Sequence, residues 1–191
     1  MKLLIALHHR FELWQAPPWV RERLQKQFPQ LEIVQLPDYS GVADQIRDSD
    51  AMLAWSVRPE QFREARRLRW IHSTAAAVHQ LIFPELVASD VILTNSRAVH
   101  GPVVAEHALA LMFAVARKIP AAVRFQRQHV WGQERMWLEG PMPGELQGAT
   151  LGLVGLGSIG REIARRASAL GMCVRAVREH PERGGAEGVQ A

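Results

Sequence analysis

Short apolar runs alternate with longer amphipathic stretches along the first half of the chain. The apolar runs are bounded by turn residues, as strands are, and the stretches between them begin at prolines, as helices often do. Helices are therefore predicted over residues 19–27, after Pro17-Pro18, and over residues 60–68, after Pro59. Such alternation indicates parallel strands joined by crossover helices. The predicted strands of this five-stranded open α/β sheet are residues 2–7, 31–35, 51–54, 70–72 and 91–94.

A long apolar helix is predicted next. Residues 103–118 are apolar on most of the helix circumference, and a second amphipathic helix is predicted over residues 121–132. A helix that is apolar almost all round is usually buried, often between domains, so we expect the first of these helices to be buried. Its carboxylate, Glu106, then needs a partner such as Arg117, or it lies at an active cleft.

A strand, a glycine-rich turn, a helix and a second strand follow one another near residue 155. The predicted strand 150–154 runs directly into Gly155-Leu156-Gly157-Ser158-Ile159-Gly160, and a helix over 161–170 and a strand over 172–177 come next. The Gly-x-Gly-x-x-Gly pattern is informative here because it follows a strand, opens a helix and lies inside a βαβ unit. It predicts a Rossmann-type dinucleotide site. The alternative is a glycine-rich turn that serves packing alone.

Each glycine of this motif has a role in such a site. Gly155 allows a tight turn, Gly157 lets the backbone approach a pyrophosphate, and Gly160 lets the helix pack closely on the strand. The free amides at the helix start would hold the phosphate charge. The predicted cofactor-binding residues are therefore Gly155, Gly157, Ser158, Ile159 and Gly160, together with Arg178.

Arg178 stands where dinucleotide sites usually bind the ribose. An acid about 20 residues beyond the motif normally accepts hydrogen bonds from the adenosine ribose. Here the residue 18 positions after Gly160 is Arg178. A guanidinium cannot accept those bonds, but it pairs with a 2′-phosphate, so NADP is favoured over NAD as the cofactor. Glu179 is the competing acid, and the alternative interpretation is that Arg178 is merely exposed.

Four further segments accompany the glycine motif. They are Trp70-Ile71-His72-Ser73-Thr74-Ala75-Ala76-Ala77-Val78, Thr94-Asn95-Ser96-Arg97, Val104-Ala105-Glu106-His107-Ala108-Leu109-Ala110-Leu111 and Glu145-Leu146-Gln147-Gly148-Ala149-Thr150-Leu151-Gly152. Together with the motif they resemble the D-isomer-specific 2-hydroxyacid dehydrogenase family over roughly residues 50–180. The resemblance implies a flavodoxin-like, parallel-sheet substrate domain over residues 1–100. It also implies that residues 101–191 hold an interdomain helix, a dimerisation arm and the first βαβ unit of a Rossmann nucleotide-binding domain.

The resemblance also implies a chemistry. In the family, a nicotinamide cofactor exchanges hydride with C2 of a small 2-oxo or 2-hydroxy acid. A histidine paired with an acid moves the proton, and an arginine holds the substrate carboxylate. The backbone amides of Ala76, Ala77 and Val78 would also bind that carboxylate, with the nicotinamide close to Ala76. Two residues depart from the family pattern, which usually has glycine at Ala77 and an acid at His79.

The family's catalytic arginine, acid and histidine follow the second strand of the nucleotide domain. No catalytic residue is therefore expected within this chain, and all three are expected beyond residue 191. Two interpretations stay open. The chain is the N-terminal part of an NAD(P)-dependent oxidoreductase acting on the CH–OH group of a D-2-hydroxy acid, or it is a non-catalytic dinucleotide-binding or dimerising remnant. In either case, the 191-residue polypeptide alone is expected to be inactive.

Assembly and location can also be predicted. Two parallel strands cannot cover both of their faces, so residues 149–177 should leave apolar surface open. The family's dimers use the long helix and the segment around Trp131, which predicts a homodimer. The one cysteine, Cys173, excludes an internal disulfide and a cysteine-based zinc site, so a cytoplasmic location is expected. No metal is expected, because the histidines lack ligand spacing.

Composition excludes two classes of partner. The chain has 23 Lys plus Arg against 19 Asp plus Glu, a net charge of +4. Its densest cluster of bases, residues 63–69, is interleaved with glutamate and indicates the solvated face of one helix, so no nucleic-acid partner is expected. The longest apolar run, residues 108–116, is far shorter than the about 20 residues that cross a membrane.

Overall fold

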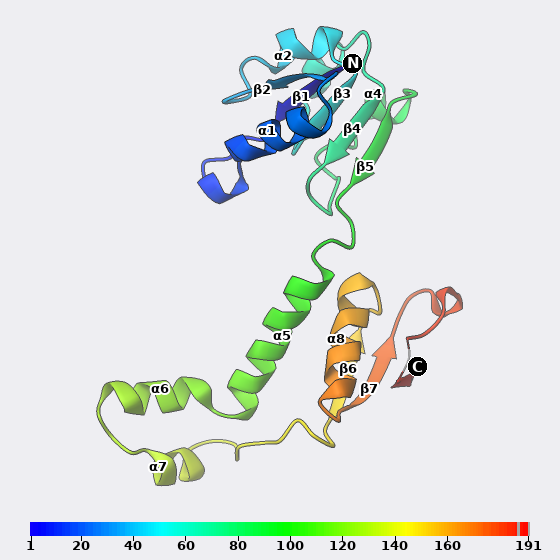
Figure 1. Ribbon diagram of the computed structural model, residues 1–191. Coiled ribbons are helices and arrows are strands. Elements are labelled where there is room, and N and C mark those ends of the chain that lie inside the picture. Colours follow the sequence, from blue (N-terminus) through cyan, green and yellow to red (C-terminus); the bar gives the residue numbers. More distant parts are fainter. Residues whose placement is uncertain (187, 191) are drawn as a thin grey trace. The chain divides into compact units, whose positions relative to one another are not determined.

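The chain folds into two compact units. A computed structural model describes residues 1–186 and 188–190 (Figure 1). The units are Met1–Arg97, here called the N-terminal unit, and Ala98–Ala191, the C-terminal unit. Each has its own sheet and its own hydrophobic core.

Five parallel strands in the order β2-β1-β3-β4-β5 form the sheet of the N-terminal unit. This confirms the predicted open α/β sheet. Ala6 pairs with Ala54, and Ala54 pairs with Ser73, so β1, β3 and β4 end side by side at one edge of the sheet. The strands are β1 (Lys2–Ala6), β2 (Glu32–Gln35), β3 (Ala51–Ala54), β4 (Trp70–Ser73) and β5 (Ile92–Asn95).

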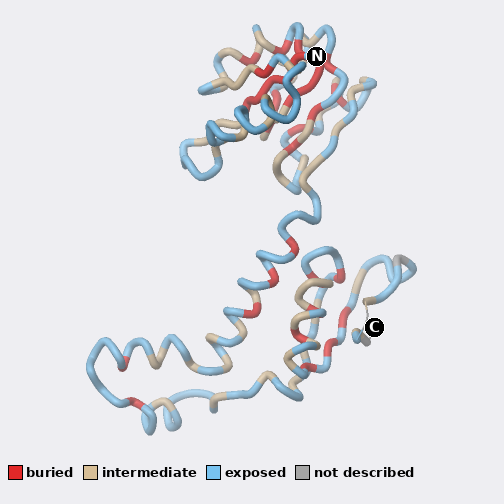
Figure 2. Tube along the Cα trace, in the orientation of Figure 1, coloured by how far each residue is buried: buried red, intermediate tan, exposed pale blue. Residues whose placement is uncertain are grey.

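Two separate clusters of buried residues pack on the two faces of this sheet. Figure 2 shows how far each residue along the chain is buried. On one face Leu4, Met52 and Ile71 are fully buried under the segments that carry α2 and α4. On the other face α1 packs against a cluster from β1, β2 and β3, while Trp70 of β4 is exposed. The helical segments are α1 (Pro18–Gln27), α2 (Val42–Gln45), α3 (Pro59–Phe62) and α4 (Pro84–Val87), with 3-10 turns η1 (Glu12–Trp14) and η2 (Ile46–Asp48).

The helix predicted over residues 60–68 is wrong in its length. The helix α3 ends at Phe62. Beyond it, the N–H of Arg66 donates to the carbonyl of Arg47 at 3.2 Å, and the N–H of Arg69 donates to the carbonyl of Asp50 at 2.9 Å. These bonds to a neighbouring segment replace the i→i−4 ladder, so the arginines do not line one helix face.

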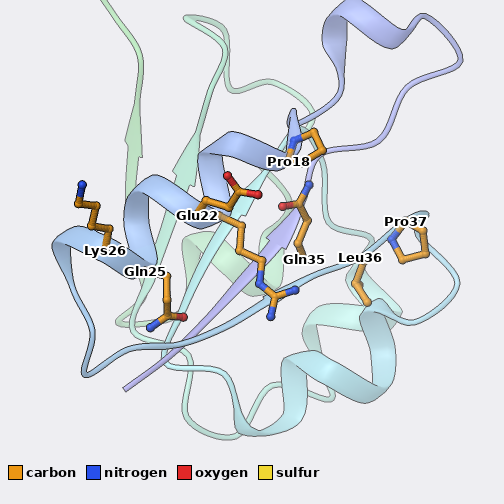
Figure 3. Close-up of a pocket in the computed structure, with 8 residues that line it drawn as sticks. Pro18, Glu22, Gln25, Lys26, Gln35, Leu36 and Pro37 are labelled. Atoms are coloured by element: carbon orange, nitrogen blue, oxygen red, sulfur yellow. The ribbon is translucent and has the colours of Figure 1, made fainter.

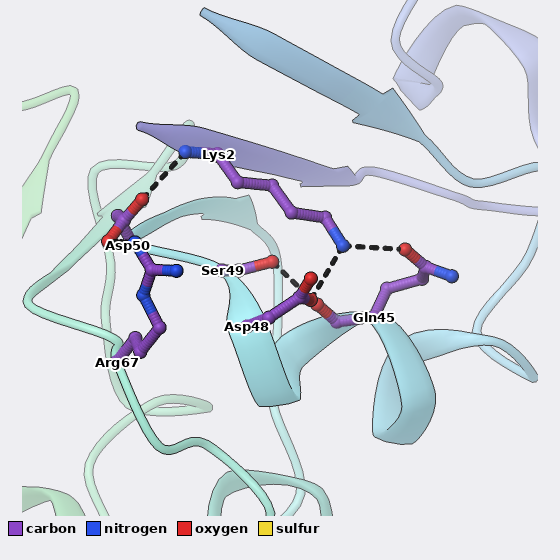
Figure 4. Close-up of polar contacts among 6 residues, drawn as sticks. All are labelled: Lys2, Gln45, Asp48, Ser49, Asp50 and Arg67. Atoms are coloured by element: carbon purple, nitrogen blue, oxygen red, sulfur yellow. Dashed lines mark hydrogen bonds and ion pairs between the residues drawn. The ribbon is translucent and has the colours of Figure 1, made fainter.

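A polar cluster ties the start of β1 to the chain before β3 (Figure 4). The Lys2 ammonium lies 2.6 Å from the carboxylate of Asp48 and donates to Gln45 Oε1 at 3.0 Å. The Asp50 carboxylate accepts the backbone N–H of Lys2 at 2.7 Å and the guanidinium of Arg67 at 3.0 Å. Lys2 and Asp50 are both buried, and each charge has its own partner. Asp48 offsets the burial of the Lys2 ammonium, and Arg67 offsets that of the Asp50 carboxylate.

The C-terminal unit places two helices beside a small parallel sheet of order β6-β7-β8. The long helix α5 packs on α8, and α8 connects β6 to β7. The predicted open sheet face is present, because Val154 is 95% exposed. The elements are α5 (Gly101–Ala116), α6 (Ile119–Arg127), α7 (Gln133–Leu138), β6 (Thr150–Val154), α8 (Ser158–Ala169), β7 (Cys173–Val177), η3 (Pro181–Arg183) and β8 (Val189–Gln190).

The expected burial of the long helix is wrong. Only Gly101, Ala105 and Leu109, spaced four apart, are buried along α5. They share the face that packs on α8, where a Cβ on Gly101 would lie 3.3 Å from the Ser158 carbonyl oxygen. The rest of the apolar circumference is open, and Val115 is 78% exposed. The apolar sequence of α5 therefore predicted more burial than its packing on α8 alone provides.

The predicted amphipathic stretch over residues 121–132 is helical only as far as Arg127, and a turn precedes the next helix. The helix α6 ends at Arg127, and α7 begins at Gln133. His129 adopts a left-handed φ of 54°, and the N–H of Val130 turns back to the Phe125 carbonyl at 3.0 Å. Gly132 lies against the Phe125 ring, where a Cβ atom would collide with it. The turn thus needs a residue without a side chain at position 132.

Candidate nucleotide and substrate sites

The glycine motif lies between β6 and α8. Gly155 has a φ of 100°, which favours glycine, and its N–H donates to the Val177 carbonyl at 2.8 Å. Gly157 is the residue before the first turn of α8. A Cβ atom on Gly160 would collide with the Gly155 carbonyl oxygen. The tight turn therefore depends on Gly155, and the close packing of the helix on the strand depends on Gly160.

A hollow of about 380 Å³ opens at this turn. None of the backbone N–H groups of residues 157–160 donates a hydrogen bond within the described part of the chain. They are the free donors of a 12-residue helix, whose N-terminus carries partial positive charge. A Cβ on Gly157 would meet no atom within 4 Å, so the backbone is open to a ligand there. The hollow is lined by Leu153, Val154, Gly155, Gly157, Ser158, Ile159, Gly160 and Ile163.

Arg178 follows β7 directly and lies next to the glycine motif. Val154 pairs with Val177, so the ends of β6 and β7 are neighbours. The Arg178 guanidinium donates to the carbonyl of Gly184, and Arg161 from α8 donates to the same carbonyl at 3.3 Å. Two guanidiniums thus converge on the loop after η3, beside the motif. Glu179, the competing acid, is exposed.

The predicted substrate loop follows β4 at the carboxyl edge of the sheet. Ala76 and Ala77 are exposed and Val78 is half-buried. Their backbone N–H groups donate no hydrogen bond in the part of the chain that the structure describes. The Asn95 amide, at the end of β5, donates to the Ala76 carbonyl at 2.5 Å. The loop is therefore held through its carbonyl while its N–H groups stay open.

Two neighbouring side chains add polar groups to this loop. The Thr74 hydroxyl is buried and has no hydrogen-bond partner among the described residues. The His72 ring lies 2.8 Å from the Thr94 hydroxyl and 3.2 Å from that of Ser96, so both of its nitrogens are engaged across β4 and β5. His72 is thus occupied in the sheet, whereas Thr74 is a free polar group under the loop.

The segment after β1 forms a compact loop that the hydrophobic pattern did not reveal. The N–H of Ala16 donates to the Leu7 carbonyl at 3.2 Å and closes the loop, which we call the aromatic loop (residues 7–16). Inside it, Gln15 donates to the His9 carbonyl at 2.7 Å. The Trp55 indole N–H, directly after β3, donates to the Trp14 carbonyl at 3.0 Å. The sequence signal was the group of large apolar residues at 11, 13 and 14, which fit neither a strand nor a helix period.

The tyrosine near this edge has a shifted pKa. Burial raises the pKa of Tyr39 above its ordinary value of 10.0, although hydrogen bonds involving His8 and Ser56 partly oppose the shift. The rings of His8 and Tyr39 meet edge to face with centroids 6.2 Å apart. Tyr39 therefore stays a neutral hydrogen-bonding group near the ends of β1 and β3.

Glu106 has a basic partner as expected, but the expected burial and the choice of Arg117 are wrong. Its side chain is 69% exposed, and its carboxylate lies 3.8 Å from Arg166 of α8. Arg117 does not pair with it and donates to the Gly144 carbonyl at 3.2 Å instead. The carboxylate needed no buried partner, because α5 exposes the face that carries it.

Three further observations on the described residues add nothing to the two candidate sites. A hollow of about 720 Å³ between α1 and the end of β2 contains none of the predicted site residues (Figure 3). No group of three His, Cys, Asp or Glu side chains among the described residues could hold a metal ion. The same part of the chain contains no helix long and apolar enough to cross a membrane.

Comparison with known proteins identifies the family. Residues 109–190 match the family model described as the NAD binding domain of the D-isomer specific 2-hydroxyacid dehydrogenases. A glyoxylate reductase of Korarchaeum cryptofilum is 31% identical over 140 residues, 71% of this chain and 42% of that protein. The chain belongs to the D-isomer specific 2-hydroxyacid dehydrogenase family. This confirms the resemblance seen in the sequence.

Further members of the family and related folds agree. A D-3-phosphoglycerate dehydrogenase of Mycobacterium tuberculosis is 33% identical over 141 residues, 72% of this chain and 26% of that protein. The chain thus spans between about a quarter and two fifths of the length of these curated relatives. A family protein from Aeromonas salmonicida has a TM-score of 0.71 at 26% identity, covering 99% of this chain and 57% of that one. An acyclic imino acid reductase in complex with NADPH and D-Arg shares the fold, with a TM-score of 0.75 at 22% identity, and covers 100% of this chain and 59% of that one.

Proposed function

We propose that this chain supplies the carboxylate-binding and phosphate-binding parts of an oxidoreductase that interconverts a D-2-hydroxy acid and a 2-oxo acid. The observation that carries the proposal is the hollow at residues 155–160, where free backbone N–H groups open a helix directly after a strand. Such an arrangement suits a pyrophosphate, because the amides and the helix dipole both attract negative charge. A bound nicotinamide cofactor would supply or accept the hydride.

The substrate carboxylate is assigned to the loop after β4. The open N–H groups of Ala76, Ala77 and Val78 can donate hydrogen bonds to a carboxylate, and bonds to a charged acceptor are stronger than neutral ones. Asn95 orients the loop through the Ala76 carbonyl. The unpartnered Thr74 hydroxyl gives the same region one more donor. Alanine at position 77 makes this loop stiffer than glycine would.

NADP is the proposed cofactor because of Arg178. Its guanidinium now donates to a backbone carbonyl on an exposed loop, a partner that a phosphate can replace. The Arg161 guanidinium lies at the same carbonyl and adds positive charge there. Both observations favour a cofactor with a 2′-phosphate over one with a free ribose hydroxyl.

A second copy of the chain is the proposed partner. A groove of about 920 Å³ with a mainly apolar lining runs between α6 and α7, and Trp131 at its rim is 86% exposed. The open side of α5 adds further exposed apolar side chains, and contiguous exposed apolar surface of this kind is typical of a protein contact. We propose a cytoplasmic location for the homodimer because the chain has a single cysteine and therefore no internal disulfide.

The test compares two glycine-to-alanine variants at positions where an added methyl group contacts no protein atom. Gly157→Ala would place a methyl group in the hollow without touching the protein, and Gly152→Ala would do the same on the open face of β6. We expect Gly157→Ala to weaken NADPH binding by about tenfold or more, because the methyl group keeps the pyrophosphate from the backbone. Gly152→Ala should leave binding unchanged, and neither variant should lower the midpoint of urea unfolding. Binding is measured by calorimetry on residues 1–191. Equal NADPH affinity in the parent chain and in both variants would show that the glycine motif serves packing alone.

A further inference from the structure

The aromatic loop exposes large apolar side chains at the edge of the sheet that also carries the proposed carboxylate site. Phe11, Leu13 and Trp14 are all more than half exposed. Loops that close on themselves and order their own side chains are frequently functional, and ligands of open α/β sheets bind beyond the carboxyl ends of the strands. The loop lies at that edge, because it begins immediately after β1.

The loop is ordered by its own contacts. The N–H of Phe11 donates to His9 Nδ1 at 3.0 Å, and the N–H of Trp14 donates to the Phe11 carbonyl at 3.0 Å. The rings of Phe11 and Trp14 meet edge to face at 5.8 Å, and the His9 ring lies 4.7 Å from that of Trp14. An aromatic surface held in one conformation loses little entropy when a ligand packs on it.

Trp55 connects this surface to the edge that carries the substrate loop. The register pairs Ala54 with both Ala6 and Ser73, so Trp55 lies between the residues that follow β1 and those that follow β4. Neighbouring strands are about 4.8 Å apart, so the carboxylate-binding loop is about two strand spacings from the start of the aromatic loop. The Trp55 indole bond to the Trp14 carbonyl fixes the aromatic loop against this position.

We infer that the aromatic loop binds the substituent on C2 of the substrate and that the substrate is a 2-hydroxy or 2-oxo acid with a bulky, preferably aromatic, side chain. The inference rests on the proposed function, since it needs the carboxylate on residues 76–78. A phenyl ring can pack on Trp14 and Phe11 while its carboxylate binds the open amides. A substrate with hydrogen or methyl in that place leaves the aromatic surface in water, so the loop discriminates by apolar contact.

The experiment compares three acids that differ only in their substituent: D-3-phenyllactate, D-lactate and glycolate. Dissociation constants are measured by calorimetry on residues 1–191, with NADPH titrated separately. We expect D-3-phenyllactate to bind about tenfold more tightly than D-lactate. Trp14→Ala should remove most of that preference and leave the D-lactate affinity unchanged.

Two further variants separate the causes. Trp55→Phe keeps an aromatic ring but removes the indole donor, so it should reduce the phenyllactate preference by loosening the loop. Phe28→Ala removes an exposed aromatic ring at the far end of α1 and should change nothing. Equal binding of the three acids, or a preference that survives Trp14→Ala, overturns the inference while the proposed function stands. Failure of all three acids to bind, with NADPH still bound, overturns both the carboxylate assignment and the inference.

Discussion

Gly155 places its carbonyl oxygen where a Cβ atom on residue 160 would have to lie. Gly160→Ala must therefore push α8 away from the strand end. Overpacking of this kind typically costs about 1–3 kcal/mol, and we expect that loss in the free energy of unfolding. Urea unfolding of the variant and of Gly157→Ala makes the comparison, because only the first meets a protein atom. A Gly160→Ala variant as stable as the parent would show that the turn relaxes freely.

Arg178 should control the choice of cofactor. Arg178→Asp replaces a phosphate-binding guanidinium with a carboxylate that repels phosphate and accepts ribose hydroxyl bonds. We expect NADPH affinity to fall by about tenfold or more, because a hydrogen bond to a charged group is lost. NADH affinity should stay the same or increase. Calorimetric titration of both nucleotides is the measurement, with Arg124→Asp on α6 as a charge-matched control. An unchanged ratio of the NADPH and NADH affinities would show that Arg178 does not bind the cofactor.

The polypeptide of residues 1–191 should bind NADPH without oxidising it. Hydride transfer to a 2-oxo acid needs a cation on the carboxylate and a placed proton donor, and the donor alone typically contributes 10²–10⁴-fold. In the described C-terminal unit, Arg161 and Arg178 hold loop carbonyls, and Arg165 and Arg166 pair with Glu162. The assay follows NADPH absorbance with glyoxylate, hydroxypyruvate and phenylpyruvate. Saturable turnover that Gly157→Ala abolishes would contradict this prediction.

The open apolar surface of α5 to α7 should form the dimer contact. Val115→Glu places a charge on that surface, and burying it without a partner would be costly. We expect light scattering to give a dimer for residues 1–191 at micromolar concentration and a monomer for Val115→Glu. Val87→Glu, at a valine of similar exposure on α4, should remain dimeric. A monomeric parent chain would overturn the proposed assembly.

Acid should destabilise the N-terminal unit through Asp50. The hydrogen bond from the Lys2 N–H, and then the Arg67 guanidinium, hold the pKa of Asp50 below its ordinary value of 3.8. Because the folded-state pKa is the lower one, the carboxylate stabilises the fold at pH values above 3.8, and this contribution is lost as the pH falls through the lowered pKa. The free energy of unfolding should therefore decrease from roughly pH 5 to pH 2.

Asp50→Asn isolates this contribution. The amide keeps an acceptor for Lys2 but cannot titrate, so the variant should lose less stability on acidification than the parent. Asp90→Asn is the control, because the Asp90 side chain makes no ion pair or hydrogen bond among the described residues. Identical pH dependence in the parent and in Asp50→Asn would exclude this carboxylate as the cause.

The local pattern determined those elements that a short run of residues specifies by itself. The predicted strands 51–54 and 150–154 are β3 and β6 with the same bounds, because a short apolar run between turn residues has few alternatives. The glycine motif likewise located its turn and helix, since Gly155 and Gly160 are required by contacts within one βαβ unit.

Only the tertiary structure decided which apolar positions are buried and which loops meet. The apolar residues of α5 surround the helix, and only the tertiary structure shows that one face alone packs on another helix. The helix predicted to continue after Phe62 ends there, and the N–H groups of Arg66 and Arg69 donate to the distant carbonyls of Arg47 and Asp50. The contact between Trp55 and Trp14 joins loops 41 residues apart in the chain. Such contacts depend on strand order and register, which set distances between segments that local hydrophobic periodicity cannot encode.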